Sequence, residues 1–333
     1  MTTIFARTTT ATDLEILDDV TRREFLAGLA AAGLLAACGD DGGGAVSGDS
    51  PTGRSVDHGL GTTVAPPASA IRSVVVLEGR RDLETALALD LPVVGAPSSS
   101  PDAPFSEHLD GLVAGVEPLF ARGELNIEAI AAASPDLIIT RESNAADVYA
   151  ELSQIAPVLP VRGDGPWRDD LRFVAGAVDL AGRAEEVIEE HEAAQRALVA
   201  DHQAALARPI AVVQYIAGGE MFWSSPNGFL LQAQVLDELG GTFVESQLDA
   251  GESEDFSAEL IAERFESAEG ILLITELDPA AELAELAGNV LWAGLPAVEA
   301  GAIVTVPFQL NYGSIIAADA CLRRFRQLFE AMA

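Results

Sequence analysis

Short apolar segments rich in β-branched residues alternate with stretches of helical periodicity over most of the chain. The apolar segments predict strands over residues 73–77, 92–95, 136–140, 158–161, 210–215, 270–275 and 303–306. Helices are predicted over residues 81–89, 127–133, 144–155, 229–239, 258–265, 280–287 and 315–333. Continuously apolar strands between helices are typical of parallel sheets that helices cover on both faces. The pattern therefore predicts an α/β fold.

The two halves of this pattern repeat one another on either side of a long helical stretch. In the first half, Asn126 and Glu128 open a helix that leads into an apolar strand ending in threonine. In the second half, Ser257 and Glu259 open a helix followed by a strand of the same kind. The repeat predicts two Rossmann-like lobes with central parallel sheets, at residues 59–166 and 207–333, joined by one long bridging helix at residues 167–206.

The N-terminus has the features of an export signal. Arg22 and Arg23 lie in the segment Thr21-Arg22-Arg23-Glu24-Phe25-Leu26, which resembles the twin-arginine export motif. The apolar run at residues 25–37 is shorter than the roughly 20 residues that a membrane-spanning helix needs. It ends in Leu35-Ala36-Ala37-Cys38, which resembles a bacterial lipobox. These resemblances imply that residues 1–37 are a signal peptide and that Cys38 is lipidated.

Residues 38–58 are rich in Gly, Ser and Asp, a composition that cannot form an apolar core. This segment is predicted to be a flexible tether between the lipid anchor and the folded part. Signal, anchor and tether together predict an extracytoplasmic protein held at the cell membrane by its lipid.

The composition excludes several classes of function. A net charge of −33, with 52 acidic and 19 basic residues, argues against a partner rich in phosphates such as nucleic acid. The chain contains no lysine, so neither Schiff-base chemistry nor a P-loop lysine is available. The four histidines, His58, His108, His191 and His202, lack the spacing of metal ligands, which argues against a metal site built by the protein. Cys321 is the only cysteine besides Cys38, so no disulfide framework is expected.

Arginine and aromatic residues follow several of the predicted strands. Ligands of α/β folds bind beyond the carboxyl ends of the strands, so residues placed there are candidates for a binding site. Guanidinium groups form forked hydrogen bonds with anionic oxygens, and aromatic faces cover organic surfaces. For any single arginine the alternative is a surface ion pair, and for Trp223 it is a packing role. The candidate ligand-binding residues are Arg80, Arg81, Arg141, Trp167, Tyr215, Phe222, Trp223, Glu276 and Tyr312.

Three segments carry a resemblance to a known family. They are Ala133-Ser-Pro-Asp-Leu-Ile-Ile139, Leu152-Ser-Gln-Ile-Ala-Pro-Val158 and Ala297-Val-Glu-Ala-Gly-Ala-Ile-Val304. With the lipoprotein signal, they make the chain similar to periplasmic binding proteins for ferric siderophores, haem and cobalamin. The resemblance implies two lobes bridged by a rigid helix, a ligand in the cleft between them, and no intrinsic cofactor. It also implies a monomer that delivers its ligand to an ABC import permease and its ATPase.

The same resemblance assigns a role to the repeated glutamates. The family docks onto its permease through one Glu on each lobe, and the matching positions here are Glu128 and Glu259. Asn126 and Ser257 can cap the two helices, and a Glu in a first turn is favoured by the helix dipole. Local helix stabilisation is therefore the alternative explanation for both glutamates.

Four interpretations follow, the first being a binding protein for a ferric siderophore, in which the chelator supplies the iron ligands. Haem or cobalamin is the variant within the family, and arginines in the cleft favour an anionic chelate over cobalamin. An exported α/β enzyme is an interpretation of another class. The chain lacks a G-x-S-x-G elbow, a P-loop and a Rossmann glycine fingerprint after the first strand, so we expect no catalytic residues. A ligand-sensing lipoprotein without an importer is the remaining alternative.

Overall fold

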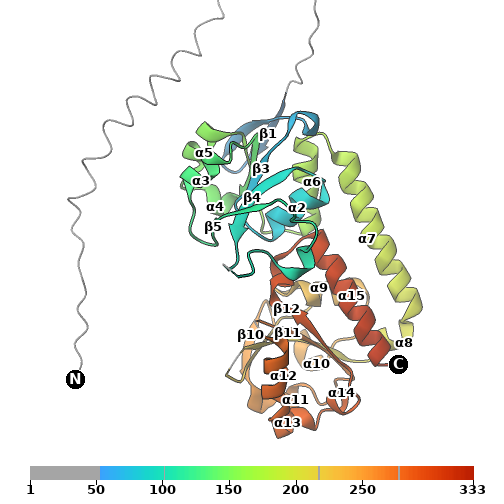
Figure 1. Cartoon of the computed structure of the whole chain (residues 1–333). Helices are drawn as coiled ribbons and strands as arrows, with labels where there is room; N and C mark the ends of the chain where they lie inside the picture. Colours follow the sequence, from blue (N-terminus) through green and yellow to red (C-terminus); the bar gives the residue numbers. More distant parts are fainter. Residues whose placement is uncertain (1–52, 101, 217, 277) are drawn as a thin grey trace, which may run out of the picture. The chain divides into compact units, whose positions relative to one another are not determined.

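The computed structural model describes residues 53–100, 102–216, 218–276 and 278–333 (Figure 1). Cys38, Arg22 and Arg23, with the predicted signal peptide and most of the predicted tether, lie outside these residues. None of the helices in the described ranges has the length and apolar character needed to cross a bilayer.

The N-terminal lobe is built on a five-stranded, all-parallel sheet of order β5-β4-β3-β6-β7. The strands are β3 (Val74–Val76), β4 (Val93–Ser98), β5 (Glu117–Ala121), β6 (Leu137–Arg141) and β7 (Val158–Val161). The connecting helices are α2 (Arg81–Ala88), α3 (Ile127–Ala132), α4 (Glu142–Ala145) and α5 (Tyr149–Ile155). The chain first adds strands on one side of β3 and then crosses to β6 on the other side. A doubly wound sheet with a switch point between β3 and β6 results, which confirms the predicted parallel α/β lobe.

The C-terminal lobe has a mixed sheet of order β10-β9-β8-β11-β12. The three strands β8 (Ile210–Ile216), β11 (Gly270–Thr275) and β12 (Ile303–Pro307) are parallel, as predicted. The strand β9 (Glu220–Trp223) pairs antiparallel with β8, and β10 (Glu254–Ser257) pairs antiparallel with β9. These two pairings correct the expectation of a wholly parallel sheet. Gly218 and Gly219 have φ of 102° and 92°, a conformation that lets β9 turn back directly along β8.

Short helices complete the C-terminal lobe. They are α9 (Leu231–Glu238), α10 (Glu245–Leu248), α11 (Ile261–Arg264), α12 (Pro279–Ala287), α13 (Val290–Ala293) and α14 (Pro296–Glu299). The helix expected at residues 258–265 is shorter than predicted, because it begins as a 3-10 turn, η3 (Ala258–Leu260). The final helix α15 (Ile315–Ala331) follows the predicted boundary closely.

The bridging stretch is three helices, α6 (Trp167–Ala177), α7 (Ala181–Asp201) and α8 (Gln203–Leu206), where a single helix was predicted. Asp179 adopts a left-handed conformation with φ of 61°, which ends α6 and lets α7 start in a new direction. The 21-residue α7 runs alongside α15 from the N-terminal lobe toward the C-terminal lobe (Figure 1). It is the longest part of the connection between the lobes.

A hairpin precedes the first lobe. The strands β1 (Arg54–His58) and β2 (Gly61–Ala65) pair antiparallel. The Thr63 hydroxyl donates a 2.6 Å hydrogen bond to the carbonyl of Val158 in β7, which anchors the hairpin to the lobe. Residues 54–58 were expected to belong to the flexible tether, so the folded part begins earlier than predicted.

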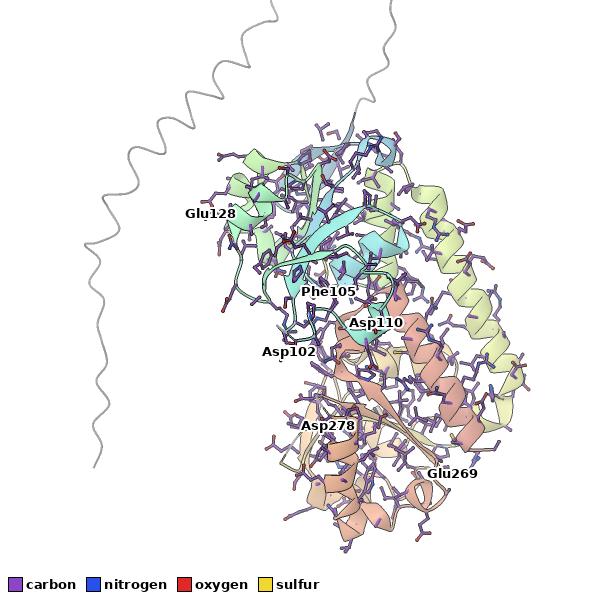
Figure 2. The ribbon with its side chains drawn as sticks, viewed as in Figure 1. Asp102, Phe105, Asp110, Glu128, Glu269 and Asp278 are labelled. Atoms are coloured by element: carbon purple, nitrogen blue, oxygen red, sulfur yellow. The ribbon has the colours of Figure 1, made fainter. Side chains whose placement is uncertain are left out.

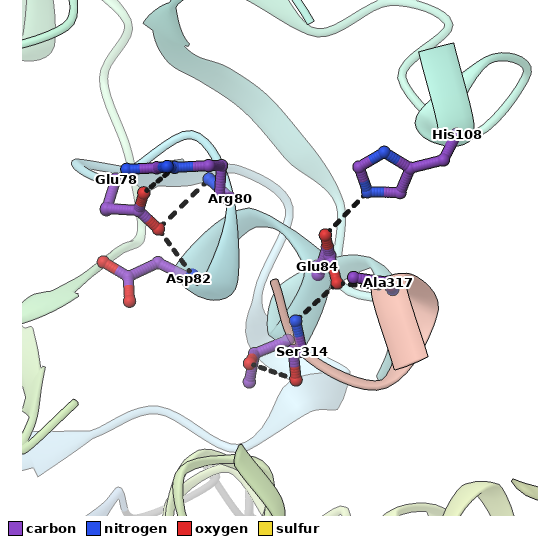
Figure 3. Close-up of polar contacts among 8 residues, drawn as sticks. Glu78, Arg80, Asp82, Glu84, His108, Ser314 and Ala317 are labelled. Atoms are coloured by element: carbon purple, nitrogen blue, oxygen red, sulfur yellow. Dashed lines mark hydrogen bonds and ion pairs between the residues drawn. The ribbon is translucent and has the colours of Figure 1, made fainter. Parts of the chain in front are cut away.

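The lobes share one apolar cluster, which includes Val74 and Leu83 of the first lobe, Leu171 of α6, Leu272 of the second lobe and Phe325 of α15. The N-terminus of α15 is also held by a buried carboxylate of the first lobe (Figure 3). The backbone N–H groups of Ser314 and Ala317 donate to Glu84 Oε2 at 2.6 and 2.9 Å. His108 Nε2 lies 2.8 Å from Glu84 Oε1. A shared core and a buried polar junction therefore fix the two lobes to one another.

Candidate ligand-binding cleft

A cleft of about 610 Å³ lies between the lobes. The N-terminal lobe and α6 contribute Arg81, Arg141, Gly163, Asp164, Gly165, Pro166, Trp167 and Arg168. The C-terminal lobe contributes Pro226, Asn227, Gly228, Phe229, Gln234, Asp237, Glu238, Glu252, Asn311 and Tyr312. Its volume falls within the range of small-molecule sites.

The N-terminal wall of the cleft is built on the switch point of the parallel sheet. The loop after β3 carries Arg80, Arg81 begins α2, and β6 ends at Arg141. Arg81 is held in place, since its Nη1 donates to the carbonyls of Gly163 and Gly165 at 3.3 and 2.9 Å and to Asp170 Oδ2 at 3.2 Å. Sequence reasoning therefore placed these three arginines correctly at the carboxyl ends of neighbouring strands.

The Arg141 guanidinium has no hydrogen-bond or ion-pair partner among the described residues, and its Nε is buried without a partner. Its side chain lies against Gly163, where an added Cβ would approach Arg141 Cδ to 2.9 Å. Gly163 also has φ of 71°, so this position needs glycine for two reasons. In a protein with 52 acidic residues, a half-buried guanidinium without a carboxylate partner is available for a ligand.

The C-terminal wall carries an aromatic cluster next to the carboxylates of Asp237, Glu238 and Glu252. The ring of Phe229 lies 4.9 Å from that of Tyr312 and 6.0 Å from that of Phe222, measured between centroids. Phe308 also packs edge-on against Tyr312, at 5.6 Å. Phe229 is 40% exposed, so this cluster offers an open apolar face to the cleft. Two of its members, Phe222 and Tyr312, were predicted.

The two walls meet where Arg80 lies over the ring of Tyr312, with Cζ 4.0 Å from the ring centroid. Burial raises the pKa of Tyr312, whereas the positive charges of Arg80, Arg122 and Arg141 act in the opposite direction. Burial likewise lowers the pKa of Arg80, which Glu78 counteracts through a 3.1 Å ion pair. Three guanidinium groups thus act on the same tyrosine. A local positive region results inside an acidic protein.

Two predicted ligand contacts are buried in the second lobe instead. Trp223 is fully buried, packs against Phe256 and Phe265, and donates from Nε1 to Glu254 at 2.9 Å. Tyr215 is 1% exposed, and burial raises its pKa to about 12. Both expectations are corrected, because strand alternation turns these two rings to the inner face of the sheet while Phe222 faces the other way.

Two other candidates occupy intermediate positions. Trp167 lines the cleft but is only 4% exposed, since Arg168 covers its ring at 4.3 Å and His191 packs edge-on against it. Glu276 lies at the end of β11, where it accepts a 3.0 Å hydrogen bond from Gln214 Nε2. It is absent from the residues that line the cleft in the described structure.

Two contributors were missed from the sequence. Phe229 was placed inside a predicted helix, but α9 begins only at Leu231, which leaves Phe229 on the loop that faces the cleft. Arg122 follows β5, a strand that was not predicted, and lines a hollow of about 350 Å³ together with Arg80 and Arg141. Residues at the carboxyl end of a strand, such as Arg122, can be predicted from the sequence only when the strand before them is predicted.

Another hollow of about 610 Å³ lies in the first lobe, beside the hairpin. Its lining is rich in carboxylates, namely Asp57, Glu142, Asp164, Asp169 and Asp170. The described residues contain no group of three or more metal-ligating side chains that could hold a metal ion. This hollow sets one arginine, Arg162, against its five carboxylates, whereas the inter-lobe cleft sets three arginines against four carboxylates, so the cleft is the better candidate for an anionic ligand.

Glu128 is exposed near the start of α3 in the first lobe (Figure 2). Glu259 is exposed in η3 of the second lobe. The predicted caps are confirmed, since Asn126 Oδ1 accepts from Ala129 N at 2.9 Å and Ser257 Oγ accepts from Glu259 N at 3.2 Å. Both glutamates are thus presented to solvent by capped turns.

Comparison with known proteins places this architecture in a family. A family model described as "Periplasmic binding protein" matches residues 78–310, which includes every residue lining the cleft except Asn311 and Tyr312. The chain belongs to the periplasmic binding protein family. This family consists of binding proteins rather than enzymes. The interpretation of the chain as an exported α/β enzyme is therefore rejected.

Relatives of this periplasmic binding protein cover most of the chain. It is 30% identical over 197 residues to the probable siderophore-binding lipoprotein YfiY of Bacillus subtilis, covering 59% of each chain. The chain thus spans about three fifths of that relative's length. It is 27% identical over 312 residues to the ferric enterobactin-binding periplasmic protein FepB of Escherichia coli, covering 84% of this chain and 92% of that one. The crystal structure of Staphylococcus aureus SirA complexed with staphyloferrin B superposes with a TM-score of 0.65 at 20% identity, covering 84% and 98%.

Proposed function

We propose that this protein binds an anionic iron chelate of the ferric siderophore class in the inter-lobe cleft and delivers it to an ABC import permease. The observation that carries this proposal is the guanidinium of Arg141, which lies in the cleft without a protein partner. Charge-assisted hydrogen bonds to anionic oxygens are the strongest interactions that such a group can make. The neighbouring Arg80, Arg81 and Arg122 extend the positive region.

The aromatic wall supports the same ligand class. A ferric chelate has a polar, charged centre and an organic shell, so it suits one wall of arginines and one wall of rings. The chelator supplies the iron ligands, and the protein therefore needs no metal site and no intrinsic cofactor. The names of YfiY and FepB refer to a siderophore and to ferric enterobactin, and SirA was solved with staphyloferrin B. Haem or cobalamin is the alternative ligand within the family.

The proposed setting is extracytoplasmic. Arg22 and Arg23 would direct export, Cys38 would carry the lipid, and the following segment would act as the tether. The relatives support the location, since they are described as a lipoprotein and a periplasmic protein. We further propose that the protein acts as a monomer.

Ligand binding is tested by fluorescence titration of residues 53–333 against ferric enterobactin, ferric staphyloferrin B, ferrichrome, haem and cobalamin. Trp167 lines the cleft, so a ligand there is expected to quench its emission. We expect at least one anionic ferric chelate to bind at submicromolar concentration, with loss of the quenching signal in Trp167→Phe while binding persists by calorimetry. Binding of cobalamin or haem alone would assign the other ligand class. If no compound of the panel bound, the proposal would be contradicted.

Docking to the permease is tested by the double variant Glu128→Ala/Glu259→Ala. We expect unchanged ligand affinity but loss of uptake, because rim carboxylates that pair with arginines of a partner set the rate and register of association. The measurement is radioactive iron uptake with a ligand titration in parallel. Glu151→Ala/Glu263→Ala, which removes one exposed carboxylate from each lobe elsewhere, is the matched control. Normal uptake by the first variant, or loss of its ligand binding, would refute the docking role.

A further inference from the structure

Asp82 is a buried carboxyl group behind the arginine wall of the cleft. It lies in the first turn of α2 and is 1% exposed. Neither of its carboxyl oxygens has a hydrogen-bond partner among the described residues. Its backbone N–H, by contrast, donates to Glu78 Oε2 at 3.4 Å, and Arg80 N donates to the same oxygen at 3.1 Å (Figure 3). The surrounding described residues therefore give the Asp82 carboxyl group no hydrogen bond.

The charges around Asp82 come from four parts of the first lobe. Glu78 lies on the loop after β3, Arg81 begins α2, Arg141 ends β6, and Asp170 lies in α6. Burial is the largest cause that raises the pKa of Asp82 well above its usual value. The negative charges of Glu78 and Asp170 add to this increase, whereas Arg141 and Arg81 oppose it. A buried carboxyl group without hydrogen bonds favours its neutral form, which agrees with this direction.

Both arginines that favour the charged form of Asp82, Arg81 and Arg141, line the cleft. An anion bound at Arg81 and Arg141 would repel a charged Asp82 and draw the guanidinium groups toward itself. We infer that Asp82 is a proton-linked positioning residue: where the free protein holds it ionised, it takes up a proton from solvent when an anionic ligand enters the cleft and releases it when the ligand leaves. This inference rests on the proposed binding of an anionic chelate.

The consequence follows from the reciprocity of linked equilibria. If the anion favours protonation of Asp82, then protonation of Asp82 favours binding of the anion. With Asp82 neutral, one buried negative charge fewer opposes the action of Arg81 and Arg141 on the ligand, while Asp170 still pairs with Arg81. Affinity therefore decreases as the pH rises through the range in which Asp82 loses its proton, and Asp82→Asn does not show this decrease.

The first test needs no ligand. The unfolding midpoints in urea of the wild type and Asp82→Asn are compared between pH 4 and pH 9. A raised folded-state pKa makes the wild type lose stability as the pH rises through that pKa, while the asparagine variant keeps it. We expect equal midpoints near pH 4 and a higher midpoint for Asp82→Asn at pH 9. A constant difference over the whole range would overturn the inference. Asp147→Asn, an exposed aspartate of the same lobe, is the control.

The second test measures the affinity for ferric enterobactin of the wild type and Asp82→Asn from pH 5.5 to pH 9. The ratio of their Kd values cancels the ionisation of the chelate. We expect the Kd of the wild type divided by that of Asp82→Asn to be near one at pH 5.5 and to rise to about ten at pH 9. A tenfold effect is within the usual range of coupling between linked sites. Binding with a constant ratio would overturn the inference and leave the proposed function intact. No binding by either protein would contradict the anionic-chelate function itself, and the proton linkage with it.

Discussion

Glu84→Ala should lower the free energy of unfolding by about 3–5 kcal/mol, because two buried backbone donors lose their acceptor at roughly 1–3 kcal/mol each. Glu84 is completely buried, and its carboxylate accepts from Ser314 N, Ala317 N and His108. Its removal leaves two N–H groups at the start of α15 without acceptors, and Ser314 makes no side-chain cap that could replace them. The carboxylate is also favoured at this helix N-terminus by the dipole.

The measurement is urea denaturation at neutral pH, with two comparisons. Glu84→Gln keeps one carbonyl oxygen that can accept from the same N–H groups, so we expect a smaller loss of about 1–2 kcal/mol. Glu330→Ala removes an exposed carboxylate from the same helix α15 and should change stability by less than about 0.5 kcal/mol. A loss of under 1 kcal/mol for Glu84→Ala would show that this junction does not hold the lobes together.

Arg141→Ala should weaken binding of the anionic chelate by about 10- to 100-fold, because a hydrogen bond to a charged group contributes roughly 1.5–3 kcal/mol. The Arg141 guanidinium has no hydrogen-bond or ion-pair partner among the described residues, so its removal breaks neither kind of bond and should change stability little. The loss of affinity can therefore be assigned to the ligand. The effect should grow further in Arg80→Ala/Arg141→Ala, since Arg80 lies against the opposite wall at Tyr312.

Calorimetric titration with ferric enterobactin measures this effect, and thermal unfolding checks that each variant is folded. Arg172→Ala is the matched control, because Arg172 is exposed on α6 and pairs with Glu185 at 2.8 Å outside the cleft. We expect its affinity to equal that of the wild type. An Arg141→Ala protein that binds as tightly as the wild type would remove the main support for an anionic ligand.

Strand ends were the most predictable part of the cleft. Arg80, Arg81 and Arg141 follow strongly apolar strands, and parallel strands bring their carboxyl ends to one edge of the sheet. Arg122 was missed because β5 has the sequence Glu-Pro-Leu-Phe-Ala, which lacks β-branched residues and contains a proline. Because the sequence of β5 did not predict a strand, Arg122 was not recognised as a strand-end residue.

The aromatic residues show what sequence alone cannot determine. Phe222 and Trp223 are neighbours in β9, so they point to opposite faces, and only the pairing of β9 with β8 decides which ring is buried. The prediction chose both, and the structure buries Trp223. The Glu84 junction left no local signal, because its partner Ser314 is 230 positions away along the chain.

The two walls of the cleft come from separate halves of the chain and differ in chemistry, with arginines before α6 and rings after α8. A substitution at Phe229 by another uncharged residue alters the shape that the cleft accepts and leaves its charge unchanged. A substitution of Arg141 by an uncharged residue changes the charge of the cleft. Substitutions in one half of the gene can therefore change which chelate shapes the cleft accepts. Substitutions in the other half can independently change which chelate charges it accepts.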